Sequence, residues 1–287
     1  MKRCLACASE FSGERWHCPQ CGWGPEQAAY PKFPMLDGEG FDEEFFEILE
    51  EVEDSSFWFR ARNDLIIWAL TKYAPSARSL LEVGCGTGYV LAGVNRAFPQ
   101  QKLTGLELFT AGLDVARSRV PAAELLQGDA RRLPFTEEFD VACAFDVIEH
   151  IDEDELVLRE MRRTLKPGGL ALVSVPQHPR LWSAADAAAQ HKRRYTRDEL
   201  LERAREAGLE IVHATSFVSL LAPLLYASRI RTRDEAAHDL RSEFPSGRLL
   251  NGALGGAMSV ERALIQRGVS FPIGGSLLMI ARRPVTP

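Results

Sequence analysis

Three glycines at alternate positions follow a short apolar run and constrain this chain more than any other feature. Residues 79–84 read Ser-Leu-Leu-Glu-Val-Gly, and the turn Gly84-Cys-Gly-Thr-Gly88 comes directly before helix-forming sequence. Glycine permits the positive φ that such a turn needs, and it lets a ligand lie against bare backbone. In α/β sheets a nucleotide-like ligand is seated at such a strand end. The run therefore predicts a strand, a turn and a helix that hold a ligand of this kind.

The spacing of the glycines separates this turn from two other nucleotide loops. The pattern G-C-G-T-G is neither the G-x-G-x-x-G of dinucleotide folds nor the G-x-x-x-x-G-K-[ST] of phosphate loops. No Lys-Ser or Lys-Thr pair follows to hold phosphate and magnesium, and Glu82 stands just before the first glycine. That carboxylate would repel a triphosphate but not a ligand that carries an amino group.

Short apolar segments alternate with helical segments from residue 79 onward. Strands are expected at 79–84, 102–107, 123–127, 139–145, 169–175, 209–216 and 276–282. Helices are expected at 88–97, 110–119, 152–165 and 196–207, after an earlier helix at 64–73. This alternation predicts a parallel sheet that is covered by helices on both faces.

Acidic residues end three successive predicted strands. After Glu82, the second strand ends at Glu107, which lies 19 residues beyond Gly88. An acidic residue near this position accepts both ribose hydroxyls in nucleoside-binding α/β folds. The third strand runs into Gly-Asp129-Ala, for which an ordinary Asp turn is the alternative. Because the carboxyl ends of parallel strands share one edge of the sheet, these acids predict one ligand site.

These segments, in this order and at these spacings, resemble the class I S-adenosylmethionine (AdoMet)-dependent methyltransferase domain over about residues 55–215. The marks are EVGCGTG, the strand-ending Glu107, GDA, FDVIEHI and RRTLKPGGLALVSVP. They are typical of methyltransferase type 11/12 relatives, similar to ubiquinone-biosynthesis O-methyltransferases. The resemblance implies a Rossmann-like, seven-stranded α/β sheet whose last strand, 276–282, runs antiparallel.

The resemblance also implies which residues bind AdoMet. They belong to the glycine turn and the strand ends: Glu82, Gly84, Cys85, Gly86, Gly88, Glu107, Asp129, Ala130, Phe145 and Asp146. Phe59 and Arg60, in an aromatic run before the first strand, match a segment that covers the methionine end of the cofactor. Core packing of an N-terminal helix is the alternative for these two residues.

Methyl transfer to a hydroxyl or amine needs an aligned acceptor and can need a base, for which histidine suits neutral pH. His191, in the loop Gln-His-Lys-Arg-Arg-Tyr-Thr before the helix at 196–207, is the expected base, and His150 is the second candidate. Tyr195 and its basic neighbours would grip an anionic group of the acceptor. The alternative is a solvated basic loop that ends in a helix cap at Thr196.

Four of the six cysteines fall in the first 21 residues, as Cys4, Cys7, Cys18 and Cys21. The spacing is C-x2-C, ten residues, then C-x2-C. Two-residue spacing lets both thiolates of a pair reach one tetrahedral ion, so two pairs complete a Cys4 site. We expect structural zinc, with a redox pair or an iron site as the alternatives.

The cysteines and the composition shifts divide the chain into parts. We expect a zinc-ribbon-like module over 1–26, a linker and an acidic helix over 27–54, and the methyltransferase domain over 55–287. Within that domain, 217–270 would form a helical cap. Its apolar start, 217–226, is too short to span a bilayer and could equally contact a second copy or a membrane surface.

Composition bounds the partners and the location. The 287 residues are 46% hydrophobic with a net charge of −6, which argues against a strongly basic surface for nucleic acid. No secretory signal or membrane-spanning run is evident, so a cytoplasmic location is the default expectation.

These features together lead to an expected function. We expect methyl transfer to a small acceptor that is partly hydrophobic or anionic, with O-, N- and C-methylation all open. The alternatives are an RNA methyltransferase that uses the ribbon to grip RNA, and an AdoMet-binding protein without catalysis. The oligomeric state is left open.

Overall fold

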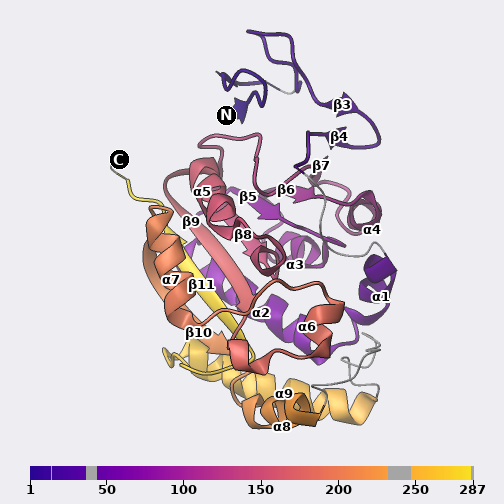
Figure 1. Cartoon of the computed structure of the whole chain (residues 1–287), viewed down its shortest axis with the longest axis vertical. Coiled ribbons are helices and arrows are strands. Elements are labelled where there is room, and N and C mark those ends of the chain that lie inside the picture. Colours follow the sequence, from indigo (N-terminus) through magenta and orange to yellow (C-terminus); the bar gives the residue numbers. More distant parts are fainter. Residues whose placement is uncertain (14, 37–43, 232–246, 286–287) are drawn as a thin grey trace.

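The computed structural model describes residues 1–13, 15–36, 44–231 and 247–285. Its centre is one mixed sheet, with helices on both of its sides (Figure 1). The strand order in this part of the chain is β10-β11-β9-β8-β5-β6-β7-β4-β3. Part of the expected linker and acidic helix over 27–54 and the middle of the expected cap at 217–270 lie outside the described residues.

The strands confirm the α/β fold. The parallel strands are β5 (Ser79–Val83), β6 (Lys102–Glu107), β7 (Glu124–Gln127), β8 (Phe139–Phe145) and β9 (Leu165–Pro176). The last strand, β11 (Ser276–Arg282), lies antiparallel between β9 and β10 (Glu210–Phe217), as expected. All five residues of β5 are buried, as in a central parallel strand that is covered on both faces.

Two short strands extend the expected seven-stranded sheet. β4 (Pro31–Lys32) pairs parallel with β7, and β3 (Glu26–Gln27) pairs antiparallel with β4. The amide of Phe33 donates to the carbonyl of Gln127 at 2.9 Å and continues this edge. Both strands fall in or beside the segment that composition marks as a linker. Two-residue strands are too short to show an alternating pattern in the sequence.

The helices that the structure describes are α1 (Glu44–Val52), α2 (Phe57–Tyr73), α3 (Tyr89–Ala97), α4 (Thr110–Arg119), α5 (Asp154–Thr164), α6 (Ala184–Ala188), α7 (Arg197–Glu206), α8 (Ala222–Arg231) and α9 (Arg248–Gln266). α2 begins seven residues earlier than expected, because Ser56 caps it by accepting from the amide of Trp58. The aromatic run at 57–59 is therefore the first turn of this helix. Thr196 caps α7, as expected, with a reciprocal bond to Glu199.

The N-terminal segment packs against the sheet domain. Its strands β1 (Lys2–Arg3) and β2 (Glu10–Phe11) pair with each other, and the amide of Arg3 donates to Pro134 at 2.9 Å. The Trp16 ring lies 4.9 Å from the ring of Phe33 and 5.4 Å from that of Phe135, both edge to face. This segment lies at the β7 end of the sheet (Figure 1). It shares the core of the domain through Trp16 and Leu5.

Among the described residues, no helix combines the length and the apolar character that crossing a bilayer requires. The helix α8, which begins within the apolar stretch 217–226, is ten residues long.

Candidate active site

A cavity of 890 Å³ lies at the carboxyl edge of the parallel strands. It brings together most of the residues that the sequence singles out: Phe59, Glu82, Gly84, Cys85, Gly86, Glu107, Asp129, Ala130, Phe145, Asp146, His150 and His191. Three other described residues, Arg60, Gly88 and Tyr195, are not among its lining.

The three glycines of the turn do different work. Gly84 has φ +68°, and a Cβ there would lie 2.5 Å from a Val147 methyl group, so both backbone and space require glycine. Gly88 has φ +71° and packs against Ala116 of α4, which explains why it supports the turn without lining the cavity. Gly86 has φ +50°, and a Cβ there would meet only the Phe46 ring, at 3.8 Å. Gly86 is thus the position where bare backbone faces the cavity.

Glu107 ties the end of β6 to the glycine turn. One carboxylate oxygen accepts from the amide of Gly86 at 2.9 Å, and the other accepts from Leu108 at 2.7 Å and Phe109 at 3.2 Å. The side chain is 7% exposed, and burial raises its pKa although these amide donors oppose the shift. The carboxylate is therefore fixed in the cavity wall with lone pairs left for a ligand hydroxyl.

Glu82 is the most under-satisfied acid of the cofactor end. It is 3% exposed, and its Oε2 has no hydrogen-bond partner among the described residues. Burial raises the pKa of Glu82 to about 8, although the positive charge of Arg62 opposes the shift. A buried carboxylate oxygen without a donor is costly, and a cationic amino group would relieve that cost.

This shift predicts a pH dependence of stability. The pKa of Glu82 is about 8 when folded and near 4.5 when unfolded, so in this range only the unfolded chain releases the proton. The contribution of Glu82 to the free energy of unfolding is therefore at its maximum below pH 4.5, and it is lost as the pH rises toward 8. Glu82→Gln should lose stability less steeply than the unaltered protein in urea titrations at pH 5, 6.5 and 8 without cofactor. Equal slopes would contradict the assignment, and Glu202→Gln, at an exposed position of α7, is the control.

Asp129 is held by a neighbouring arginine. Arg131 donates through Nε and Nη2 to its two carboxylate oxygens at 3.0 and 2.8 Å. Burial opposes ionisation, but these bonds lower the pKa of Asp129 below its ordinary value. The amide of Leu36 donates to the same carboxylate at 3.1 Å. The segment after β4 therefore reaches the cofactor end of the cavity.

Arg62 is a site residue that the sequence reasoning missed in favour of Arg60. On α2, position 62 lies one turn after Phe59 and faces the cavity, whereas Arg60 points to solvent. Arg62 forms an ion pair with Asp146, and its guanidinium lies 4.5 Å from the centre of the Trp58 ring. Asp146 itself has φ +56°, an uncommon conformation that aims the end of β8 into the cavity. If the helix had been expected to begin at residue 57, the sequence would have placed Arg62 on the same helix face as Phe59.

The cavity lining also brings Glu149, His150 and His191 together. One ligand atom from each lies within 4.8 Å of the others, and the two imidazole centres are 4.8 Å apart. Glu149 is fully buried, and neither of its carboxylate oxygens has a hydrogen-bond partner in another described residue. Burial raises the pKa of Glu149 well above its ordinary value, and burial lowers the pKa of His150 to about 3.

Asp186 orients His191. Its Oδ1 lies 2.9 Å from Nδ1 of His191 and accepts from Nε of Arg194 at 2.7 Å. Burial opposes the charge, but the bonds from His191 and Arg194 lower the pKa of Asp186 to about 2. An ionised Asp186 fixes the proton of His191 on Nδ1 and leaves Nε2 for other chemistry. Asp186 was not predicted from the sequence, but the capping box Ser183-x-x-Asp186 that begins α6 is a local pattern that could have drawn attention to it.

Tyr195 and Arg193 bind carboxylates of the protein itself. Tyr195 is 1% exposed, and its hydroxyl donates to Asp154 at 2.6 Å. Arg193 pairs with Asp154 at 3.0 Å and with Asp152 at 3.3 Å. The predicted catalytic role of Tyr195 therefore lacks a contact with the cavity, because the loop turns this ring into the core beneath it.

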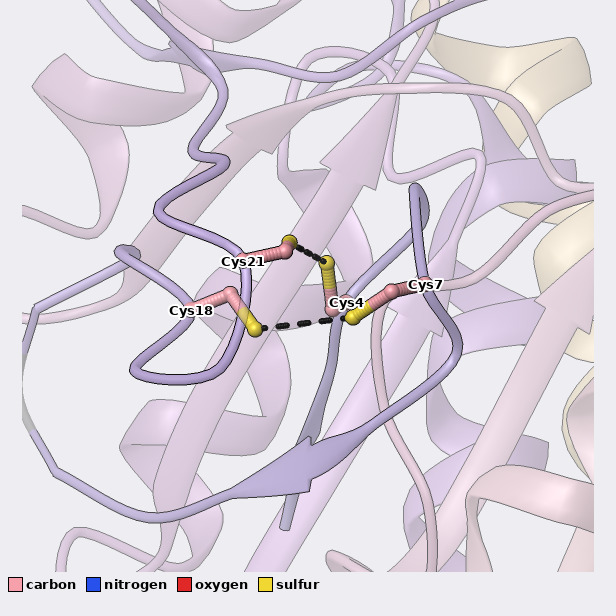
Figure 2. A group of neighbouring side chains, drawn as sticks. All are labelled: Cys4, Cys7, Cys18 and Cys21. Carbon is pink, nitrogen blue, oxygen red and sulfur yellow. Dashed lines mark hydrogen bonds between the residues drawn. The ribbon is translucent and has the colours of Figure 1, made fainter.

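The four N-terminal cysteines converge although they come from two separate turns (Figure 2). The sulfur of Cys4 lies 3.6 Å from that of Cys21, and the sulfur of Cys7 lies 3.7 Å from that of Cys18. Four thiolates at about 2.3 Å from a tetrahedral ion would be about 3.8 Å apart, so the spacing suits zinc. All four are free thiols in the structure.

Comparison with known families agrees with this geometry. Residues 81–173, which include the glycine turn, Glu107, Asp129 and the Glu149–His150 pair, match the family model described as a methyltransferase domain. This segment is a methyltransferase domain.

Individual relatives are similar to the chain over longer stretches than that segment. A Mycolicibacterium smegmatis protein described as a probable S-adenosylmethionine-dependent methyltransferase is 30% identical over 164 residues, 55% of this chain and 61% of that protein. A malonyl-[acyl-carrier protein] O-methyltransferase of Halalkalibacterium halodurans is 32% identical over 104 residues, 34% of this chain and 38% of that protein. The chain thus spans less than two thirds of the length of these relatives.

Solved structures share the fold of the methyltransferase domain. The phosphoethanolamine N-methyltransferase 2 of Haemonchus contortus aligns with a TM-score of 0.55 at 19% identity, over 85% of this chain and 58% of that chain. The [4+2]-cyclase SpnF aligns with a TM-score of 0.53 at 22% identity, over 88% of this chain and 89% of that chain. Because one of these two proteins is a cyclase, the fold by itself does not fix the reaction.

Proposed function

We propose that the chain transfers the methyl group of AdoMet to a small acceptor. The observation that carries this proposal is the buried Glu82, whose Oε2 has no hydrogen-bond partner among the described residues and which lines the cavity with the bare backbone of Gly86 in a methyltransferase domain. When bound, AdoMet supplies a methyl group made electrophilic by its sulfonium. Glu82 would accept from its amino group, and Glu107 would accept from its ribose hydroxyls.

Further cofactor contacts follow from the lining. Arg62 would contact the carboxylate of the methionine end, beside the ring of Phe59. Asp129 and Ala130 would lie at the adenine. The backbone at Gly84–Cys85 and the β8 end at Phe145–Asp146 would complete the wall. The same residues exclude water from the reacting atoms, which favours transfer over hydrolysis.

The acceptor would be partly hydrophobic. The cavity lining has an apolar part that includes Phe57 and Trp58 of α2, Ile48 of α1 and Leu225 of α8. In this proposal the acceptor lies between this apolar part and the polar cluster of Glu149, His150 and His191. Arg194, one of the basic residues that the sequence suggested for an anionic group, already binds Asp186. An amphiphilic hydroxyl or carboxyl compound would match such a wall, with its reacting atom at the cluster.

His191 would activate the acceptor. Its Nδ1 is bound to Asp186, so Nε2 is left to take the acceptor proton or to bind a cation. His150 would support this end through its ring contact with His191.

Asp186→Asn should lower kcat about 10- to 100-fold, because it weakens the bond that orients His191. AdoMet affinity should stay unchanged, because Asp186 contacts His191, Arg194 and Ser183 and none of the proposed cofactor residues. Steady-state kinetics and AdoMet titration test this prediction. Asp198→Asn, at an exposed position of α7, should have no effect on either. A loss of AdoMet binding in Asp186→Asn would contradict it.

We also propose that Cys4, Cys7, Cys18 and Cys21 hold structural zinc. The sulfur spacing supports this, and Ser9 places its hydroxyl 3.0 Å from the sulfurs of Cys7 and Cys18, where it can donate to ligating thiolates. We propose that the metal module covers 1–26 and that residues 27–54 join it to the methyltransferase domain over 55–287. Within that domain, 217–270 would form the cap.

Transfer of labelled methyl from AdoMet tests the function. The full chain should label small amphiphilic acceptors, such as hydroquinones or acyl carboxylates, and not total RNA. Labelling of RNA alone would indicate an RNA methyltransferase whose ribbon binds RNA. Tight AdoMet binding without transfer to any acceptor class would favour a non-catalytic binder. Either result would contradict the proposal.

A further inference from the structure

We propose that Glu149, His150 and His191 bind a divalent transition-metal ion at the acceptor end of the cavity. This inference rests on the proposed function and specifies how that end activates its acceptor. Two imidazoles and one carboxylate form the ligand set of catalytic zinc sites and of facial iron sites. Such a set leaves coordination positions open for an acceptor oxygen.

The positions of the three side chains suit one ion. Their ligand atoms already lie within 4.8 Å of one another. An ion bound at about 2.1 Å from each atom in tetrahedral geometry holds them about 3.4 Å apart. The ligand atoms thus need to approach by at most about 1.4 Å. His150 and Glu149 are adjacent on the short helix η1 (Ile148–His150), and His191 comes from the loop before α7.

Glu149 gives an independent reason for a cation. Its side chain is fully buried and lines the cavity, yet neither carboxylate oxygen has a hydrogen-bond partner in another described residue. Buried carboxylates are normally paired, hydrogen-bonded or bound to metal. The nearest described guanidinium groups are engaged elsewhere, since Arg62 pairs with Asp146 and Arg194 pairs with Asp186. A bound cation would satisfy both oxygens.

Asp186 completes the arrangement from behind. Metal-binding histidines usually donate their second ring N–H to a carboxylate, which fixes the tautomer and strengthens the ligand. His191 has this partner, at 2.9 Å from Nδ1. Asp186 is 1% exposed and is held in turn by Ser183 and Arg194. The ring of His191 is therefore positioned before any ion arrives.

An ion here would replace a general base. An acceptor hydroxyl bound to a divalent cation is more acidic, so its proton leaves to water near neutral pH. The acceptor oxygen then forms its bond to the methyl carbon as the carbon–sulfur bond breaks, and the sulfonium becomes a neutral thioether. His191 serves as a ligand in this scheme.

Cobalt titration of the full chain, with zinc first loaded in the ribbon, tests the site. We expect binding of one Co²⁺ beyond the zinc, with the weak visible absorption of nitrogen and oxygen ligands. Glu149→Gln and His191→Asn should weaken that binding at least tenfold, and Asp186→Asn about 10- to 100-fold. Glu202→Gln should bind Co²⁺ as the unaltered protein does.

The proposal is overturned if the unaltered chain binds no Co²⁺ beyond the ribbon, or if Glu149→Gln and His191→Asn bind it as well as the unaltered chain. AdoMet binding measured on the same samples separates this failure from failure of the proposed function. Methyl transfer that persists under a chelator that leaves the ribbon zinc in place would overturn the metal site and keep the methyltransferase.

Discussion

Glu107→Gln is expected to weaken AdoMet binding by about 100-fold, which corresponds to about 2.7 kcal/mol. The carboxylate accepts from the amides of Gly86, Leu108 and Phe109, and we propose that it also accepts from the ribose. Glutamine offers one oxygen and an NH2 group. The neutral side chain loses the charge-assisted hydrogen bonds of the carboxylate, each of about 1.5–3 kcal/mol. If its NH2 group faces the turn amides, donors also face donors and stay unpaired.

Calorimetric titration with AdoMet measures this effect, and circular dichroism checks that the variant is folded. Glu202→Gln removes a charge of the same kind from an exposed position and should bind AdoMet normally. If the folded Glu107→Gln protein binds AdoMet as tightly as the unaltered chain, the proposed hydrogen bonds between Glu107 and the ribose are wrong.

Cys18→Ser is expected to lower the thermal midpoint of unfolding by about 6–12 °C. The substitution should cost about 3 kcal/mol of the free energy of unfolding, and each kcal/mol shifts the midpoint of a domain of this size by about 2–4 °C. Apart from Leu5 and Trp16, which join the core of the domain, the described part of the ribbon has a small cluster of Cys4, Phe11 and Cys18 with Trp23 against it, and we expect metal to be needed to fold it. Its loss also unpacks Trp16 from Phe33 and Phe135.

A second consequence of Cys18→Ser lies at the cofactor end. Segment 31–36 connects the ribbon to Asp129 through the bond from Leu36, so AdoMet affinity should fall in the same variant. Gln20→Ala, an exposed change within the same knuckle, is the control for both measurements. A purified protein without zinc, and with an unchanged midpoint in Cys18→Ser, would contradict structural zinc.

The central sheet could be predicted from the sequence because its strands are buried on both faces. Such strands appear as continuous apolar runs bounded by turn residues. The bounds at 102–107, 139–145 and 276–282 agree with β6, β8 and β11. The β4–β3 extension could not be predicted, because its strands are two residues long and their pairing depends on the open edge of β7.

The site was predictable where chemistry follows directly from a strand end. Glu82, Glu107 and Asp129 reach the cavity for that reason. Arg62 was missed because the helix that carries it begins at Phe57, where Ser56 supplies the cap. Asp186 was missed because α6 is five residues long, and its link to His191 is a tertiary contact that local sequence does not encode.

Calorimetric titration of the full chain with AdoMet tests whether the cavity is a cofactor site. We expect saturable binding of one AdoMet per chain, weakened in Glu107→Gln and retained in Asp186→Asn. The first variant alters the proposed cofactor seat, and the second alters only the acceptor end. No binding at millimolar AdoMet, or equal binding by the unaltered chain and Glu107→Gln, would contradict it.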